Sequence, residues 1–262
     1  MTSSVESRID WHHWRDRWEA QQAAYTVDWE GRYAIMLDAV EALLPEAFVA
    51  IDIASGPGTI SRRLLDRFPR ARCIAVDLDP VLLSMGQATL GTAEGRLRWV
   101  EADLKSAAWL TALGEEQVDA VLSSTALHWL PAEHLVRLYR ELGTIIRPGG
   151  VFLNGDNMRF GPELPAFSAL SQWRRDRLWS DDSFAARDQE NWQQWWDALA
   201  REPAAANLLA ERERRFGWMK EANIGWTQPI FDVHVAALRD AGFREVGTIW
   251  QSVTNRVLMA VR

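Results

Sequence analysis

The segment 49–59 places the strongest constraint on the fold, because an apolar run there ends at an acid and continues into a turn of small residues. The run closes on Asp52, and Ala54, Gly56 and Gly58 follow at alternate positions. Apolar residues at helical spacing come next, so the segment predicts a strand, a tight turn and a helix. Since small side chains let a ligand approach the backbone, we expect a ligand at the carboxyl end of this strand.

Further apolar runs along the chain also end at polar residues. One ends at Asp77, about one strand and one helix after the first, and later runs lead to Asp103 and Ser123. Because the carboxyl ends of parallel strands share one sheet edge, these residues predict a single cleft. An acid after the second strand can accept hydrogen bonds from both hydroxyls of a ribose. Asp79 and Pro80 are typical of the N-cap and first residue of the next helix.

The alternation of strands and helices over 48–157 predicts an α/β fold with a parallel sheet and right-handed crossovers. A helix over 133–146 is expected to bury a leucine-rich face and to stop at the Pro-Gly-Gly segment that follows. Residues 232–241 predict another helix, with Asp232 as its N-cap and Gly242 at its end.

These motifs, taken in order, resemble those of class I S-adenosylmethionine-dependent methyltransferases. The residues that carry the resemblance are 52–58, 77, 101–103, 123–130 and 145–153. It covers roughly residues 30–156 and a C-terminal hairpin, which the apolar runs 245–253 and 256–261 and the turn Thr254-Asn255 predict. Segment 121–131 is similar to the small-molecule branch of the family that includes trans-aconitate methyltransferase.

The resemblance implies a Rossmann-like, seven-stranded, mostly parallel sheet with a C-terminal antiparallel hairpin, N-terminal helices and a helical insertion before the sixth strand. It implies a single methyltransferase domain over 1–262, in which 1–46 form a helical cover and 158–230 a helical lid. The implied cofactor is S-adenosyl-L-methionine, and the implied reaction is methyl transfer to a small molecule.

The resemblance also assigns residues to the cofactor. Asp52 is expected to hold the methionine ammonium through backbone or water, and Arg32 to pair with the methionine carboxylate. Asp77 is expected to bind the ribose with Leu78 against the adenine, while Asp103 accepts a hydrogen bond from the adenine amino group. The full set of implied cofactor contacts is Arg32, Asp52, Ala54, Ser55, Gly56, Gly58, Asp77, Leu78, Asp103, Leu104 and Ser123.

One position departs from the family pattern, because Ala54 stands where the first glycine is expected and Ser55 follows it. We expect the added methyl group to be tolerated and to move the methionine end of the cofactor slightly outward. Replacing Ala54 by glycine is then expected to keep cofactor affinity equal or slightly better. The added backbone freedom is expected to lower thermal stability modestly.

Two other functions stay open at this point. A nicotinamide-dependent oxidoreductase needs Gly-x-Gly-x-x-Gly, but the third glycine would fall on Thr59 or Ser61. The carboxylate of Asp52 would also repel a diphosphate. A non-catalytic, regulatory S-adenosylmethionine-binding protein would keep the same fold, and turnover would separate it from an enzyme.

Candidate catalytic residues are those near the carboxyl edge of the sheet. His128 follows the fourth strand, and imidazole titrates near neutral pH, which suits an oxygen or nitrogen acceptor. Its alternative role is to pack beside Trp129. Asp156, just past the fifth strand, is a second candidate base and alternatively a cap. No cluster has metal-ligand spacing, so no metal is expected.

Tryptophans are concentrated in two regions outside the motifs. Trp11, Trp14 and Trp18 share one face of an N-terminal helix. Insertion 158–230 holds seven of the fifteen tryptophans and predicts two or three helices. We expect a lid over an apolar pocket for an apolar or aromatic acceptor, with fixation of the lid as the alternative role of these side chains.

The composition sets limits on partners and compartment. The net charge of −7 argues against a nucleic-acid substrate, and the basic clusters 174–177 and 212–215 include acids, which favours solvated helix faces. The single cysteine, Cys73, excludes an intrachain disulfide. Without a membrane-length apolar run or a signal-like start, we expect a cytoplasmic protein with no membrane partner.

Overall fold

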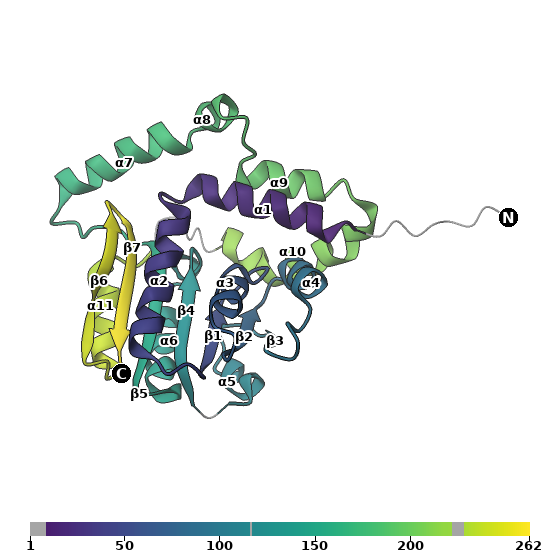
Figure 1. Ribbon diagram of the computed structural model, residues 1–262. Coiled ribbons are helices and arrows are strands. Elements are labelled where there is room, and N and C mark those ends of the chain that lie inside the picture. The colour runs from purple at the N-terminus through teal and green to yellow at the C-terminus, as the bar shows by residue number, and fades with distance from the viewer. Residues whose placement is uncertain (1–8, 116, 222–227) are drawn as a thin grey trace.

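The computed structural model describes the backbone of residues 9–115, 117–221 and 228–262, and the side chains of these ranges except at 218–221. Its centre is a seven-stranded sheet with the strand order β3-β2-β1-β4-β5-β7-β6 (Figure 1). The strands are β1 Val49–Ile53, β2 Arg72–Asp77, β3 Leu97–Glu101, β4 Val118–Ser124, β5 Ile146–Asn157, β6 Glu245–Ser252 and β7 Asn255–Val261. Strands β1 to β5 pair in parallel, and β7 is antiparallel to both β5 and β6. This topology confirms the predicted fold class.

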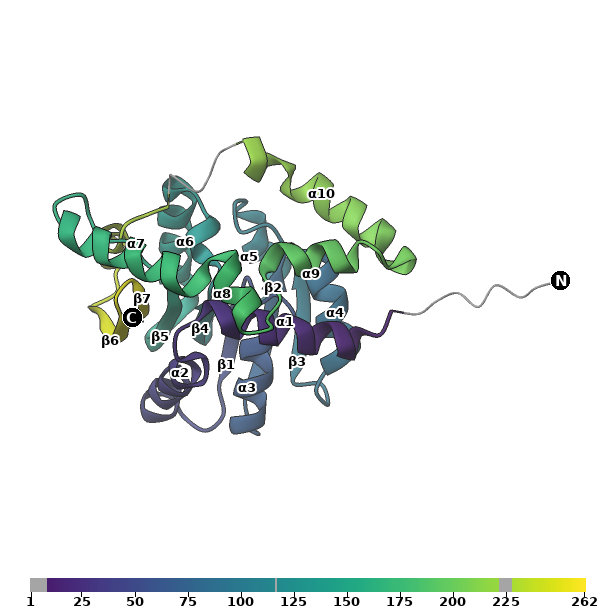
Figure 2. The ribbon, with the colours of Figure 1, turned by 90° about the horizontal axis from the view of Figure 1, so that it is seen from above.

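Helices cover both faces of the sheet and the edge to which the parallel strands point (Figures 1 and 2). They are α1 Trp11–Tyr25, α2 Trp29–Leu43, α3 Thr59–Arg67, α4 Pro80–Leu90, α5 Ala108–Leu113, α6 Ala132–Ile145, α7 Pro165–Trp179, α8 Asp181–Ala186, α9 Trp192–Leu199, α10 Ala206–Glu221 and α11 Phe231–Asp240. One apolar core lies between the sheet and α5, α6 and α11. A second lies between the sheet and α2 and α3.

The N-terminal helix and the insertion pack together across the carboxyl edge of the sheet (Figure 2). Trp14 and Trp18 of α1 are buried and meet Trp195 of α9 in edge-to-face contacts with ring centroids 5.5 and 4.9 Å apart. Trp18 also contacts Trp196. These insertion tryptophans therefore fix α9 to α1, as the alternative role predicted, while Trp173 is 60% exposed.

The insertion contains more helices than sequence periodicity indicated, because α7, α8, α9 and α10 all lie within 158–230. Two of its tryptophans, Trp218 and Trp226, lie outside the described side chains. Within the described ranges, none of the helices combines the length and the apolar character that crossing a bilayer requires.

The N-cap was predicted from local sequence for two helices, α4 and α11, correctly for the first and wrongly for the second. Asp79 caps α4 as predicted, and its Oδ1 accepts hydrogen bonds from the backbone N–H groups of Val81 and Leu82. The prediction that Asp232 caps α11 is wrong, because the N-cap is Ile230. Ile230 forms a bridge with Arg159, so a long-range backbone pairing sets the start of α11.

The C-terminal hairpin is present, but its turn lies one residue earlier than expected. Ser252 pairs with Asn255, which leaves Val253 and Thr254 as the turn. Val253 has a φ of +58°, an uncommon left-handed conformation for a β-branched residue.

Candidate active site

The turn after β1 is built from residues in the left-handed region. Ala54 has a φ of +51°, Gly56 of +53° and Gly58 of +78°. A Cβ on Gly58 would lie 2.7 Å from a ring carbon of Trp99, so packing as well as backbone conformation requires glycine there. Ser55 donates its backbone N–H to the carbonyl of Val76 at 3.1 Å, which joins the turn to the end of β2. Because a residue with a Cβ is strained at the φ of Ala54, we no longer expect the substitution Ala54→Gly to lower stability.

Asp77 lies at the end of β2 with its carboxylate turned toward this turn. Its Oδ2 accepts the backbone N–H of Gly56 at 2.7 Å, and its Oδ1 accepts those of Leu78 and Asp79 at 2.7 and 2.8 Å. Burial and the nearby Asp79 carboxylate raise the pKa of Asp77 to about 6. The structure therefore brings together the predicted glycine turn and the predicted ribose-binding acid.

Asp52 of β1 is buried and forms hydrogen bonds with α3. It is 1% exposed, and its Oδ2 accepts both the backbone N–H and the hydroxyl of Ser61 in α3, at 3.0 and 2.7 Å. Burial raises the pKa of Asp52 to about 7. The hydrogen bonds of this carboxylate thus go to the first turn of α3, and its role toward a ligand stays a prediction.

Arg32 is fully buried in α2, one turn from the helix start. Its Nη2 donates to the hydroxyls of Ser124 and Thr125, both at 2.7 Å, at the end of β4. Among the described residues, its buried Nε and Nη1 have no hydrogen-bond partner, and the carboxylate of Asp156 is near enough for its charge to be felt without forming an ion pair. Because a buried guanidinium without an anion is costly, this site fits a ligand carboxylate. Thr125, with a φ of +57°, adds local strain at the same place.

The remaining predicted cofactor residues lie along the same edge. Asp103 follows β3 and accepts the backbone N–H of Lys105 at 2.8 Å, while Leu104 beside it is buried. Ser123 is fully buried in β4, and its hydroxyl donates to the carbonyl of Ile53 in β1 at 3.0 Å. Leu78 is partly exposed at the end of β2.

The two candidate catalytic residues form one hydrogen-bonded pair. The Nδ1 atom of His128 lies 2.6 Å from Oδ1 of Asp156, and the backbone N–H of His128 donates to Oδ2 at 3.0 Å. Burial alone would raise the pKa of Asp156, but the charge and hydrogen bond of His128, the backbone N–H of Asn157 and the charge of Arg32 outweigh it and lower that pKa. The His128 side chain is 15% exposed, whereas the Asp156 side chain is fully buried. Asp156 therefore orients the imidazole, and its Oδ1 also accepts the backbone N–H of Asn157, the next residue, at 2.7 Å.

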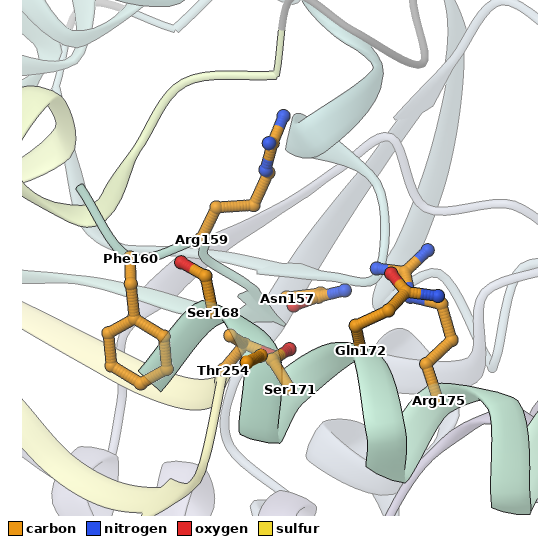
Figure 3. A pocket seen from close by; sticks show the side chains of 9 residues that line it. Asn157, Arg159, Phe160, Ser168, Ser171, Gln172, Arg175 and Thr254 are labelled. Carbon is orange, nitrogen blue, oxygen red and sulfur yellow. The ribbon is translucent and has the colours of Figure 1, made fainter. Parts of the chain in front are cut away.

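A pocket of about 350 Å³ lies between α7, the end of β5 and the β6–β7 turn (Figure 3). Asn157, the residue after Asp156, lines it, whereas His128 and Asp156 do not. It is lined by Asn157, Arg159, Phe160, Ser168, Ala169, Ser171, Gln172, Arg175 and Thr254. Most of these side chains are polar, which differs from the apolar pocket that tryptophan density led us to expect. Among the described residues, Arg159 and Arg175 have no carboxylate partner, although the protein is acidic as a whole.

Sequence reasoning missed several of these residues. Arg175 belongs to a cluster that we interpreted as a solvated helix face, yet it lines the pocket. Arg212 and Arg215, in the second such cluster, contact the β2 and β3 ends, and only their pairing with acids distant in sequence reveals this. Within the part of the chain that the structure describes, no group of His, Cys, Asp and Glu could hold a metal ion.

The sheet order, the acids at the carboxyl ends of its strands and the glycine turn define the fold of class I S-adenosylmethionine-dependent methyltransferases. Residues 50–150 match the methyltransferase domain family. Trans-aconitate 2-methyltransferase of Azoarcus sp. (strain BH72) is 34% identical over 134 residues, which are 51% of this chain and 48% of that protein. The match thus spans about half the length of this curated relative.

Solved structures agree at the level of the fold. An O-methyltransferase family protein from Burkholderia thailandensis superposes with a TM-score of 0.54 and 18% identity, covering 96% of this chain and 69% of that one. An O-methyltransferase family 2 protein from Planctomyces limnophilus, in complex with apigenin, gives 0.54 and 16%, with coverages of 98% and 63%. These findings confirm the resemblance: residues 50–150 match the methyltransferase domain family, and the fold is shared with solved methyltransferases.

Proposed function

We propose that the protein binds S-adenosyl-L-methionine and catalyses methyl transfer to a small molecule with a proton-bearing oxygen or nitrogen. The His128–Asp156 pair carries this proposal, because a protein that only binds the cofactor has no use for an oriented imidazole at the edge of the cleft. The regulatory alternative and the nicotinamide alternative have no comparable support.

The residues at the sheet edge fit the cofactor. The unpartnered Nε and Nη1 of Arg32 would receive the methionine carboxylate, and Asp77 would accept hydrogen bonds from the ribose hydroxyls. Leu78, Asp103 and Leu104 would surround the adenine. When bound, S-adenosyl-L-methionine supplies a methyl group made electrophilic by the positively charged sulfur. The protein's own contribution is to orient the acceptor and to remove its proton.

His128 is the base in this proposal. With Nδ1–H donating to Asp156, the other ring nitrogen, Nε2, is left as an acceptor for the proton of the methylated atom. Asp156 fixes this tautomer and stabilises the imidazolium that forms. Its buried carboxylate is held ionised by the same contacts that lower its pKa.

The pocket supports an acceptor that also carries an anionic group. Arg159 and Arg175 supply positive charge and have no carboxylate partner in the described part of the chain, while Asn157 and Gln172 add neutral hydrogen-bonding groups. Asn157 directly follows Asp156, so the pocket and the carboxylate that orients the base both include residues at the end of β5. The name of the relative from Azoarcus, trans-aconitate 2-methyltransferase, points in the same direction.

The first test is calorimetry with S-adenosylhomocysteine, NAD and NADP. We expect binding of S-adenosylhomocysteine alone, and nicotinamide binding without it would overturn the assignment. Transfer from labelled S-adenosylmethionine is then measured with phenolic acids and matched uncharged phenols. Binding without transfer to any acceptor would favour the regulatory alternative.

The acceptor charge is tested with Arg159→Gln and Arg175→Gln. Each is expected to raise KM for the phenolic acids and to leave KM for the uncharged phenols unchanged. Arg177→Gln is the matched control, because Arg177 lies on the same helix but contacts the exposed Trp173. Equal KM values for acids in all three variants would remove the anionic group from the proposal.

A further inference from the structure

Helix α10 packs Leu208 and Leu209 against the tryptophan cluster, and two of its arginines form the polar contacts with the strand ends. The Nε atom of Arg212 donates to Oδ2 of Asp79 at 2.6 Å, and only 5% of the Asp79 side chain is exposed. The guanidinium of Arg212 also lies 3.7 Å from the ring centroid of Trp196, which belongs to the tryptophan cluster joining α1 and α9. This ion pair is therefore largely shielded from water.

Arg215, one turn later, reaches the ends of two strands. Its Nη1 donates to the backbone carbonyl of Leu78 at 2.9 Å, and its Nη2 lies 2.8 Å from Oε1 of Glu101, the last residue of β3. Its Nε donates to Glu211 within α10, which fixes the side chain in this direction. The two arginines thus bind α10 at the positions proposed for the ribose and the adenine.

A continuous set of hydrogen bonds leads from α10 into the glycine turn. Arg212 holds the carboxylate of Asp79, whose own backbone N–H donates to Asp77 at 2.8 Å. Asp77 in turn accepts the backbone N–H of Gly56 at 2.7 Å. Arg212 also offsets the negative charge of Asp79, which otherwise acts against an ionised Asp77 next to it.

We propose that α10 covers the adenosine end of the cofactor site and that Arg212 and Arg215 couple the docking of this helix to cofactor binding. This inference rests on the proposed cofactor site. Arg212 and Arg215 are positioning residues: they act on Asp77 and Leu78 through Asp79 and the backbone. Because such coupling is reciprocal, the docked helix strengthens cofactor binding and the bound cofactor strengthens docking by the same factor.

The test combines ligand affinity with hydrogen exchange. We measure S-adenosylhomocysteine binding by calorimetry, and backbone exchange over 206–221 by mass spectrometry, with and without this ligand. In the unaltered protein the ligand is expected to slow exchange in α10. Arg212→Gln and Arg215→Gln are each expected to weaken binding by about fivefold or more and to reduce that protection.

Arg214→Gln is the matched control. Arg214 lies on the same helix, is mostly exposed, and within the described ranges pairs with Glu211 alone. It is expected to change neither affinity nor protection. A charge exchange, Glu101→Arg combined with Arg215→Glu, is expected to recover part of the affinity lost in Arg215→Glu alone, which a loss of folding would not allow.

The outcomes separate this inference from the proposed function. If the unaltered protein does not bind S-adenosylhomocysteine, both are wrong. If it binds, and the two variants expose α10 to exchange without changing affinity, α10 only packs against the domain and the inference fails. Tighter binding in the variants would also overturn it, because α10 would then compete with the cofactor.

Discussion

The Nδ1 atom of His128 lies 2.6 Å from the carboxylate of Asp156, and the same carboxylate accepts the backbone N–H of His128. Two contacts from one buried carboxylate leave the imidazole little freedom to rotate. A side chain that served only to pack beside Trp129 would not require a charged partner at this distance.

Replacing Asp156 by asparagine therefore tests the base directly. The neutral amide cannot stabilise an imidazolium, so we expect kcat to fall by about 10²–10⁴-fold with little change in S-adenosylhomocysteine affinity. His128→Asn is expected to give a similar loss, and His134→Asn, on the partly exposed side of α6, none. Loss of ligand affinity with unchanged kcat would instead assign His128 and Asp156 a packing role.

Arg32 offers a test that distinguishes one end of the ligand from the other. Arg32→Gln removes the charge from a site with two unpartnered nitrogen atoms, so the ligand carboxylate loses its partner. We expect S-adenosylhomocysteine affinity to fall by roughly 1.5–3 kcal/mol. Methylthioadenosine has no amino-acid carboxylate, so its affinity is expected to stay the same. An equal loss for both ligands would mean that the substitution disturbs the whole site.

The pKa of Asp77 predicts how ligand binding depends on pH. Because the pKa of this carboxyl is raised to about 6, the group becomes protonated as the pH falls through that value. Protonation removes the charged acceptor for the ribose hydroxyls, so affinity for S-adenosylhomocysteine is expected to fall below about pH 6. The charged groups nearby are Asp52, Asp79, Glu101, Arg212 and Arg215.

Asp77→Asn isolates this effect. The amide cannot ionise, so the variant is expected to bind more weakly at neutral pH and to show a flatter profile on acidification. Calorimetry across the range measures both quantities. A parallel profile in the two proteins would assign the pH dependence to another group.

The sequence was informative where structure follows from local pattern. Apolar runs ending at Asp52, Asp77 and Ser123 predicted the strands, because buried parallel strands are continuous and their polar ends meet at one edge. Asp79 before a proline predicted a helix start for a similarly local reason. The capping role of Asp232 failed since the start of α11 depends on pairing with Arg159, far away in the chain.

The contacts of the helical insertion could not be predicted from local pattern. Helical spacing shows which residues share a face but not which surface that face meets, so Arg212 and Arg215 looked like solvated residues. The same uncertainty concealed the polar pocket: Arg175 on α7 and Thr254 in the hairpin turn become neighbours only once the insertion folds back over the sheet.

The conformation of Ala54 reverses an expectation about stability. With a φ of +51°, alanine occupies a region that costs about 1–2 kcal/mol for residues with a Cβ. Glycine avoids this cost but loses about 0.5–1 kcal/mol through a freer unfolded chain. We therefore expect Ala54→Gly to raise the free energy of unfolding by up to about 1 kcal/mol, with ligand affinity unchanged or slightly better. Urea unfolding and calorimetry check the two parts, and a clear loss of stability would contradict the strain argument.

Asp52 makes a separate prediction about stability and pH. Burial raises its pKa from 3.8 to about 7 in the folded protein, so between these values the folded state binds more protons than the unfolded state. The free energy of unfolding contributed by this group must then decrease as the pH rises through this window.

Asp52→Asn keeps an oxygen for the hydrogen bonds from Ser61 but cannot ionise. We expect the free energy of unfolding of Asp52→Asn, relative to that of the unaltered protein, to rise by up to about 4 kcal/mol as the pH is raised from about 4 to about 8. Urea unfolding of both proteins across this range measures the difference. The contribution of Asp77 largely cancels in it, because both proteins contain this residue. A difference that does not change with pH would show that Asp52 stays ionised throughout.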